Sequence, residues 1–149
     1  MLVSSLDKEQ FKIIYNSLYD KVVKIAYIII GELNIAEDVA LDAFDKYCSE
    51  NKRYKSCEKA EHAVIRLAMN ISLKYNSNGI INVSKDEVNK AITSLDAPLM
   101  KVIILKNEGF NYNEIASILK LSENIVKSRV FLARKKLDSL LNKEESYVY

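Results

Sequence analysis

Glycine and proline are scarce in this chain, and its apolar residues recur at helical spacing along most of its length. The 149 residues include three glycines and one proline, so few positions interrupt a helix. The first apolar series comprises Phe11, Ile14, Leu18, Val22, Ile25 and Ile29. Spacings of three and four residues place such side chains on one face of an α-helix. Short strand-like runs such as 79–83 are too few to build a sheet. The sequence therefore predicts an all-α fold.

Capping residues and a polar segment divide the chain into two helical lobes. Asp7 is placed to cap a first helix that ends near Gly31. A second helix begins near Asn34, and its expected inner face comprises Ala36, Val39, Ala43 and Tyr47. A further helix is expected over about 59–75, with its buried face at Val64, Leu67, Ile71 and Tyr75. The polar, glycine-containing segment that follows fits no helical period and predicts a short linker. We therefore predict an N-terminal domain at 1–76, a linker at 77–83, a C-terminal domain at 84–142 and a tail at 143–149.

The C-terminal domain opens with its own capping signals. Ser84 and Glu87 have the spacing of a capping box for a short helix that reaches about Ser94. Asp96 and Pro98 start a longer helix, which is expected to end near Gly109.

The segment Tyr112–Leu137 predicts two helices joined by a tight turn. Asn111 caps the first helix, and Ser122 stands at the N-cap of the second. Beyond Ser122, one apolar stripe is expected to be buried: Val126, Val130, Ala133 and Leu137. Between 122 and 137 the chain has five basic residues and one acid. An apolar back with a polar, cationic front suits a helix that reads a DNA major groove. The alternative is a solvated basic helix in an ordinary bundle.

Composition and leader signals bear on the location of the protein. The formal charge of +2 is too small to indicate nucleic-acid binding by itself, but the N-terminal half is neutral and the basic excess lies near the C-terminus. The first residues lack the cationic start and apolar core of a signal peptide. The longest apolar run, Ile25–Ile30, is far shorter than the roughly 20 residues of a membrane span. We expect a cytoplasmic protein.

Catalytic and metal-binding patterns are not evident. Cys48 and Cys57 have no Cys or His partners at zinc-ligand spacing, so we expect thiols without a metal. His62, the single histidine, lies on a predicted helix and is expected to be a surface or packing residue. No nucleophile–base pair or phosphate-binding glycine loop accompanies it. We therefore expect no enzyme activity and no cofactor.

Three segments, in order along the chain, resemble parts of bacterial sigma factors. Residues 95–137 resemble the C-terminal promoter-reading domain, most closely that of the extracytoplasmic-function (ECF) type. The likeness is strongest in EIASILKLSENIVKSRVFLARKKL, residues 114–137. AEDVALDAFDKY, residues 36–47, resembles the helix that grips the polymerase clamp. IRLAMNISLKY, residues 65–75, resembles the helix that opens the −10 element. Three motifs in a shared order are more specific than one helix-turn-helix.

The resemblance implies that the protein has three cooperating surfaces, two of which bind DNA. The residues expected at the −35 element are Ser122, Glu123, Asn124, Lys127 and Ser128 at base edges, with Arg129 and Arg134 at phosphates. The residues expected at the −10 element are Lys52, Arg53, Tyr54 and Lys55 in a basic loop, with Asn70 and Lys74 on the next helix. The alternative for that loop is an ordinary exposed loop.

The third implied surface binds core RNA polymerase. Its expected residues are Glu37, Asp38, Leu41, Asp42 and Asp45. The alternative is that these acids form a merely solvated helix face. The resemblance also implies promoter DNA and an anti-sigma protein as partners.

The chain departs from the family pattern at several positions. Ala63 stands where an aromatic residue is usual early in the −10 helix. Leu41 replaces a polar residue on the polymerase-binding face, and Ile125 replaces a usual threonine. Lys120 occupies a turn position where glycine is common, and a non-glycine residue at positive φ is strained there. These departures make promoter opening a weaker expectation than promoter binding.

Three functions remain open from the sequence. The favoured one is an ECF-type sigma factor that directs transcription initiation. The second is a sigma-like DNA-binding regulator that does not melt promoters. The third is a helical interaction protein, such as an anti-sigma or adaptor protein, whose basic helix binds an acidic partner.

Overall fold

The computed structural model describes residues 5–50, 57–77 and 87–142, and every regular element in these ranges is an α-helix. The helices are α1 (Ser5–Ile30), α2 (Leu33–Glu50), α3 (Cys57–Ser77), α4 (Glu87–Thr93), α5 (Ala97–Asn107), α6 (Tyr112–Leu119) and α7 (Glu123–Leu141). The predicted all-α fold with a C-terminal helix-turn-helix is confirmed. Residues 78–86 and 143–149 lie outside the described residues, and with them most of the predicted linker, the Ser84 cap and the tail.

The N-terminal lobe is a bundle of α1, α2 and α3, which pack on one another. The predicted inner face of α1 is buried at Ile14, Leu18, Val22, Ile25 and Ile29. The predicted inner face of α2 is buried at Ala36, Val39, Ala43 and Tyr47. Gly31 ends α1 with φ 83°, a left-handed conformation that glycine adopts without strain. Helical spacing therefore identified the core of both helices correctly.

Helix α3 buries a wider face than its spacing predicts. Val64 is buried as expected, but Leu67, Ile71 and Tyr75 are only half-buried. The fully buried positions include Ile65, Ala68 and Met69 instead. The reason is that α3 contacts α1 and α2 in its own lobe and α6 in the other, so neighbours cover more than one side of it.

The C-terminal lobe is built around α5. This helix is buried at four successive positions, Val102, Ile103, Ile104 and Leu105, as expected for a helix surrounded by neighbours. Helix α7 packs against α4, α5 and α6, and α5 also contacts α6. Gly109, at φ 98°, lies just beyond α5 and turns the chain toward α6.

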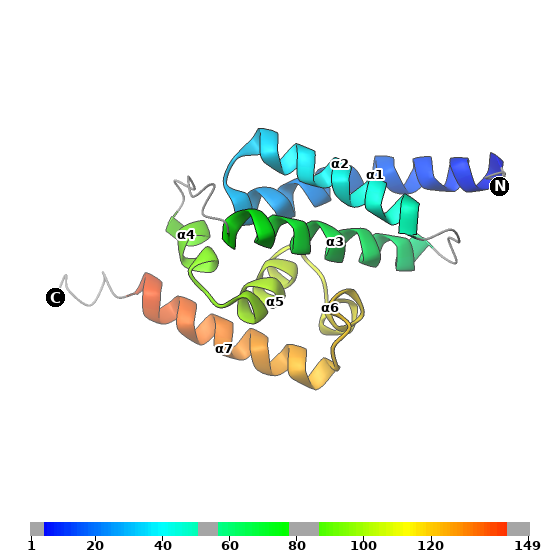
Figure 1. Cartoon of the computed structure of the whole chain (residues 1–149). Coiled ribbons are helices and arrows are strands. Elements are labelled where there is room, and N and C mark those ends of the chain that lie inside the picture. Colours follow the sequence, from blue (N-terminus) through cyan, green and yellow to red (C-terminus); the bar gives the residue numbers. More distant parts are fainter. Residues whose placement is uncertain (1–4, 51–56, 78–86, 143–149) are drawn as a thin grey trace.

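The two lobes lie directly against each other. Figure 1 shows α2 at the top, α3 across the middle and α7 along the bottom of the molecule. Helix α3 contacts α6, and α1 contacts α4 and α5. The buried residues of both lobes form one continuous cluster. Helices α1 and α3 therefore both join the lobes, and the division of the chain into two domains stays a prediction.

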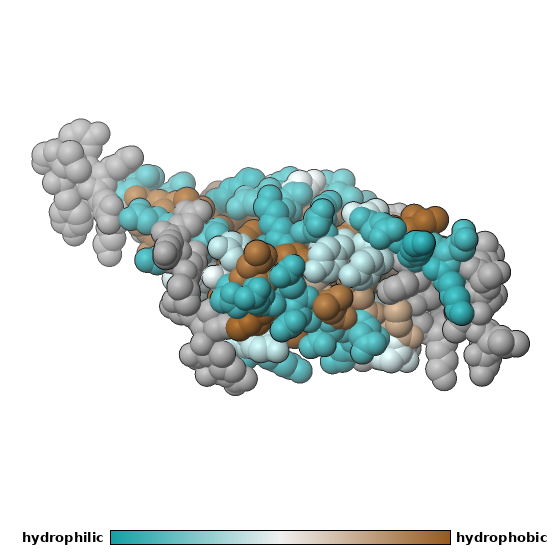
Figure 2. Space-filling view, turned by 90° about the horizontal axis from the view of Figure 1, so that it is seen from above, coloured by the Kyte–Doolittle hydropathy of each residue, from teal (hydrophilic) through white to brown (hydrophobic). Residues whose placement is uncertain are grey.

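The face formed by the N-terminal lobe is mainly hydrophilic. Figure 2, which views the molecule from above, shows hydrophilic side chains over most of this face and separate hydrophobic spots between them. Exposed apolar residues of the lobe include Ile13, Tyr27, Leu33 and Leu41. Scattered apolar residues of this kind are normal on a protein surface.

One buried hydroxyl of α3 gives a test of the packing. Among the described residues, Ser72 Oγ is the buried side-chain oxygen that makes no hydrogen bond. A buried polar group without a partner destabilises the folded state, and alanine has the higher helix propensity. Ser72→Ala is therefore expected to raise the free energy of unfolding by about 1 kcal/mol. Chemical denaturation measures this change.

Ser17→Ala in α1 is the matched control, since Ser17 is exposed and donates to the Ile14 carbonyl oxygen at 3.1 Å. It reports the gain in helix propensity without relief of a buried hydroxyl. A Ser72→Ala protein no more stable than the control would contradict the packing of α3.

Candidate nucleic-acid interface

The helix before the turn is fixed at its start by a reciprocal pair of hydrogen bonds. Asn111 Oδ1 accepts from the Glu114 amide at 2.8 Å, and Glu114 Oε1 accepts from the Asn111 amide at 2.9 Å. This capping box satisfies backbone donors that have no partner within the helix. Asn111 is thus the cap that the sequence predicted, and α6 begins at a defined residue.

The turn between α6 and α7 is short and tightly bonded. Lys120 adopts the left-handed conformation, with φ 57° and ψ 49°, as its position in the turn led us to expect. The Leu121 amide donates to the Ala116 carbonyl oxygen at 3.0 Å. Ser122 Oγ then accepts from the Ile125 amide at 3.3 Å and caps α7. These bonds fix the angle at which α7 leaves the turn.

Helix α7 has one apolar side and one polar side. Its buried residues are Val126, Val130, Ala133 and Leu137, which is the stripe that the sequence predicted. The residues expected to meet base edges are all exposed: Ser122, Glu123, Asn124, Lys127 and Ser128. Arg134 is exposed, and Arg129 is half-buried. Packing thus anchors α7 by one side and leaves its polar side accessible.

The Tyr112 ring lies near the exposed ammonium group of Lys127. Lys127 Nζ lies 5.8 Å from the centroid of the Tyr112 ring, and Lys106 Nζ lies 4.8 Å from the same centroid. An ammonium group over an aromatic face is attracted by the negative face of the ring. Tyr112 therefore limits where Lys127 can point, although this residue was not among those predicted for the site.

Phe131 is a surface residue that the sequence reasoning missed. Its side chain is 67% exposed in the middle of α7. It follows Lys127 by four residues and Ser128 by three, so it shares their face of the helix. Phe131 could have been identified from the sequence, because it is an apolar residue that lies outside the buried stripe of α7. An exposed aromatic ring on a DNA-facing helix can contact the methyl group of thymine.

The predicted polymerase-binding residues share one face of α2. Asp38, Asp42 and Asp45 are exposed, and Glu37 is half-buried. Leu41, at 48% exposure, lies among them. The spacing of 38, 41, 42 and 45 is that of one helix face. This face carries negative charge with an apolar residue at its centre.

The residues predicted for the −10 element are only partly described. Lys52, Arg53, Tyr54 and Lys55 lie outside the described residues. Lys74 is exposed near the end of α3. Asn70 is exposed as well, but its Oδ1 accepts a hydrogen bond from Lys101 Nζ of α5 at 3.2 Å. One predicted DNA contact is therefore engaged by the C-terminal lobe.

Polar residues at every fourth position of α3 bind the C-terminal lobe. His62 Nδ1 and Ser117 Oγ share a hydrogen bond of 2.8 Å, and His62 is buried. Arg66 Nη1 donates to the Ile118 carbonyl oxygen at 3.1 Å. Asn70 completes the series through Lys101. His62 is thus a packing residue, one of the two roles that we expected for it.

Contacts from α1 reinforce the junction between the N-terminal and C-terminal lobes. Lys24 Nζ lies 3.4 Å from Glu108 Oε1, and Lys21 Nζ lies 4.8 Å from the centroid of the Phe110 ring. Both partners belong to the segment that joins α5 to α6. The Lys24 side chain is 65% exposed and the Glu108 side chain is 10% exposed, so solvent screens this ion pair only in part.

Lys101 is the titratable group that the junction perturbs. Burial lowers the pKa of Lys101 below its ordinary value, and the positive charge of Arg129 lowers this pKa further. Both effects disfavour the charged ammonium. The charged form of Lys101 is therefore disfavoured in the folded protein, and this penalty decreases as pH rises toward the ordinary value of 10.5.

The amino-acid sequence of the C-terminal lobe identifies its family. Residues 85–137 match the family described as sigma-70, region 4. The C-terminal lobe is a sigma-70 region 4 domain. Its α6, turn and α7 form the helix-turn-helix, so α7 is the recognition helix of this region 4 domain.

The fold of the whole chain is that of a solved sigma factor. The chain is similar to the sigma factor RpoE of Bartonella quintana, whose structure is a complex with the anti-sigma factor NepR. The TM-score is 0.70 at 22% sequence identity, over 89% of this chain and 96% of that one. No curated protein sequence matches this chain. The fold and the region 4 match together confirm the resemblance to an ECF-type sigma factor that the three motifs predicted.

None of the helices in the described ranges has the length and apolar character needed to cross a membrane. Within the same ranges, no group of three or more His, Cys, Asp or Glu side chains is placed to hold a metal ion.

Substitution of Lys120, the left-handed residue in the turn between α6 and α7, tests whether the backbone is strained there. A non-glycine residue in this conformation costs about 1–2 kcal/mol, and glycine's greater chain entropy offsets about half of that gain. Lys120→Gly is therefore expected to raise the free energy of unfolding by about 0.5–1 kcal/mol. Lys120→Ala removes the same charge but keeps a Cβ atom, so it should give no such gain. Equal stability of the two variants, measured by denaturant unfolding, would contradict the strained turn.

Proposed function

We propose that this protein is a sigma factor that binds core RNA polymerase and directs initiation by reading −35 and −10 promoter elements. The proposal rests mainly on how the recognition helix of the region 4 domain is oriented in the fold. This helix buries its apolar stripe and exposes the polar residues from Ser122 to Ser128 at its N-terminal end. A major-groove helix reads bases with its N-terminal residues, so the exposed end is the one required.

The proposed −35 contacts follow from side-chain chemistry. The Asn124 amide can form two hydrogen bonds with one adenine edge, and Lys127 can donate to guanine. Ser122, Glu123 and Ser128 add further polar groups at the same end of the helix. Arg129 and Arg134 are placed to contact phosphates, which fixes position without reading sequence. Phe131 adds an apolar contact that favours thymine.

The acidic face of α2 is proposed to bind polymerase. Glu37, Asp38, Asp42 and Asp45 supply negative charge, and Leu41 supplies an apolar centre for a contact with basic residues of the polymerase clamp. In Figure 1, α2 and the recognition helix lie on opposite sides of the molecule. One protein can therefore meet polymerase and DNA at the same time.

Promoter binding requires the two lobes to separate. The −10 and −35 elements lie roughly 25 base pairs apart, which is roughly 85 Å of B-DNA at 3.4 Å per base pair. Asn70, proposed for −10 DNA, and Arg129, proposed for −35 DNA, instead line one cavity. The arrangement described here is thus a closed one. Release of Asn70 from Lys101 is part of the opening. The other proposed contacts of the −10 element are Lys52, Arg53, Tyr54, Lys55 and Lys74.

An anti-sigma protein is proposed as a further partner. The solved relative, the Bartonella RpoE, is in complex with the anti-sigma factor NepR. The shared fold supports a similar interaction for this chain. Because its proposed partners are polymerase and promoter DNA, we place the protein in the cytoplasm.

Transcription with purified core polymerase tests the proposal. Promoter-specific run-off transcripts, together with co-elution of the protein with core polymerase, are the expected result. Footprints on promoter DNA without transcripts would instead assign a sigma-like regulator that does not melt promoters. If neither transcripts nor footprints are found, the proposal fails and an interaction protein takes its place.

The base-reading face is tested by two substitutions on the recognition helix. Asn124→Ala and Lys127→Ala each remove a proposed hydrogen bond to a −35 base. Each is expected to weaken binding to the preferred −35 sequence by about tenfold, as loss of a base contact costs about 1–3 kcal/mol. Selection from a library of randomised −35 sequences should show relaxed preference at the corresponding position.

Lys136→Ala is the matched control, because Lys136 is exposed on the same helix but outside the proposed contacts. It should leave the preferred −35 sequence unchanged. Unchanged selection by the Asn124 and Lys127 variants would show that the reading face has been assigned wrongly.

A further inference from the structure

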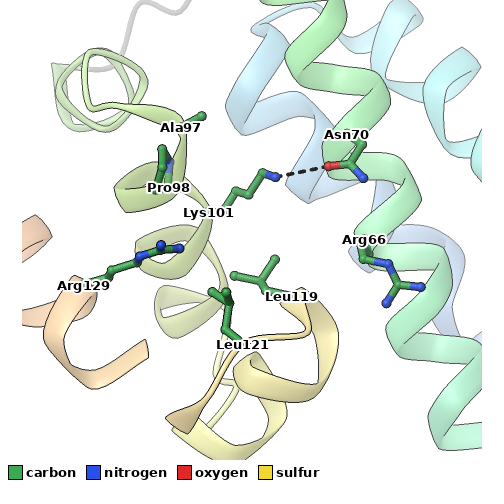
Figure 3. A pocket seen from close by; sticks show the side chains of 8 residues that line it. All are labelled: Arg66, Asn70, Ala97, Pro98, Lys101, Leu119, Leu121 and Arg129. Carbon is green, nitrogen blue, oxygen red and sulfur yellow. Dashed lines mark hydrogen bonds between the residues drawn. The ribbon is translucent and has the colours of Figure 1, made fainter. Parts of the chain in front are cut away.

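A cavity of about 270 Å³ lies at the junction between the lobes. Arg66 and Asn70 reach it from α3 of the N-terminal lobe. The region 4 domain contributes the remaining lining residues: Ala97, Pro98, Lys101, Leu119, Leu121 and Arg129. Figure 3 shows Lys101 extending from α5 toward Asn70, with Leu119 and Leu121 at the turn of the helix-turn-helix. The cavity is therefore shared by both lobes.

The lining of this cavity is strongly cationic. Arg66, Lys101 and Arg129 carry positive charge, and none of the eight lining residues is acidic. Burial lowers the pKa of Lys101, and the positive charge of Arg129, which lines the same cavity, lowers it further. Like charges held together in a partly desolvated site destabilise each other unless a counter-charge is present. An anion would remove this repulsion.

The donors that remain suit an oxyanion. Arg66 uses Nη1 on the Ile118 carbonyl oxygen, and a guanidinium has five N–H groups in all. Lys101 gives one hydrogen bond to Asn70 and has three N–H groups. The Asn70 amide nitrogen adds further donors. Guanidinium and ammonium groups that line one cavity can bind phosphate through charge-assisted hydrogen bonds.

The volume of the cavity and its apolar residues limit the choice of ligand further. Small-molecule sites typically measure about 300–1,000 Å³, and this cavity is slightly smaller. Ala97, Pro98, Leu119 and Leu121 offer an apolar wall beside the cations. A phosphate ion, or a phosphate group on a small organic molecule, fits this combination of charge, size and apolar surface.

We propose that the cavity binds a phosphate group and that the bound phosphate holds the lobes together. Arg66 and Asn70 on one lobe and Lys101 and Arg129 on the other would contact the same ligand. Such a ligand binds only the closed arrangement and therefore increases its population. If the proposed function holds, the ligand also competes with promoter DNA for Asn70 and Arg129.

Titration calorimetry on the full chain tests the site without DNA or polymerase. Inorganic phosphate and adenosine monophosphate are titrated separately, with sodium chloride of equal ionic strength as the reference. Saturable binding of either is expected. Binding of phosphate alone identifies the ion as sufficient, and tighter binding of the nucleotide identifies a phosphate ester. If neither binds beyond the chloride reference, the proposal is overturned, whereas the proposed function is unaffected.

Substitutions locate the ligand. Lys101→Gln, Arg129→Gln and Arg66→Gln are each expected to raise Kd by about tenfold, because each removes a charge-assisted hydrogen bond to the phosphate. Lys136→Gln, which removes an exposed charge elsewhere on α7, should leave Kd within about twofold. Equal effects of all four substitutions would show non-specific attraction and overturn the site. A loss limited to Lys101→Gln and Arg129→Gln would place the ligand on region 4 alone and overturn the bridge.

A measurement on the unmodified chain guards against misfolded variants. Bound phosphate should raise the pKa of Lys101, because a nearby anion favours the charged ammonium. NMR titration of lysine side chains with and without phosphate measures this shift. An unchanged Lys101 pKa at saturating phosphate would overturn contact between the ligand and this side chain.

Discussion

The apolar stripe of α7 is the contact on which the arrangement of the C-terminal lobe depends. Val126, Val130, Ala133 and Leu137 are buried where α7 meets α4, α5 and α6. Because this stripe fixes the rotation of α7 about its own axis, it also decides which side chains face outward. The polar end from Ser122 to Ser128 is exposed as a consequence of core packing. The hydrophobic effect thus positions the groups that are proposed to read DNA.

Features of the fold that depend on neighbouring residues could be predicted from the sequence. The caps at Asn111 and Ser122, and the left-handed Lys120, follow from short-range hydrogen bonding and sterics. The contacts of His62, Arg66 and Asn70 could not be predicted, because their partners lie 55, 52 and 31 residues away. Polar residues four apart also have the pattern of a solvated helix face. Only the tertiary arrangement distinguishes the two cases.

The charge of the chain as a whole is nearly balanced, but the charge at the junction between the lobes is not. The N-terminal half has equal numbers of acidic and basic residues, and the formal charge of the chain is only +2. This near-neutral balance hides the convergence of Arg66, Lys101 and Arg129 at one cavity. Burial disfavours the charged form of Lys101, and the charge of Arg129 disfavours it further. The total charge of the chain therefore does not describe the local charge at this cavity.

The spacing of the junction residues along α3 determines how the lobes can part. Four residues advance an α-helix by about 400°, so each step from His62 to Arg66 to Asn70 moves the contact around the axis by about 40°. The line of contacts therefore winds about α3 instead of running parallel to it. In the proposed separation of the lobes, contacts arranged along such a winding line can break one after another. Partly opened forms with one or two of these bonds intact are then expected as intermediates of that separation.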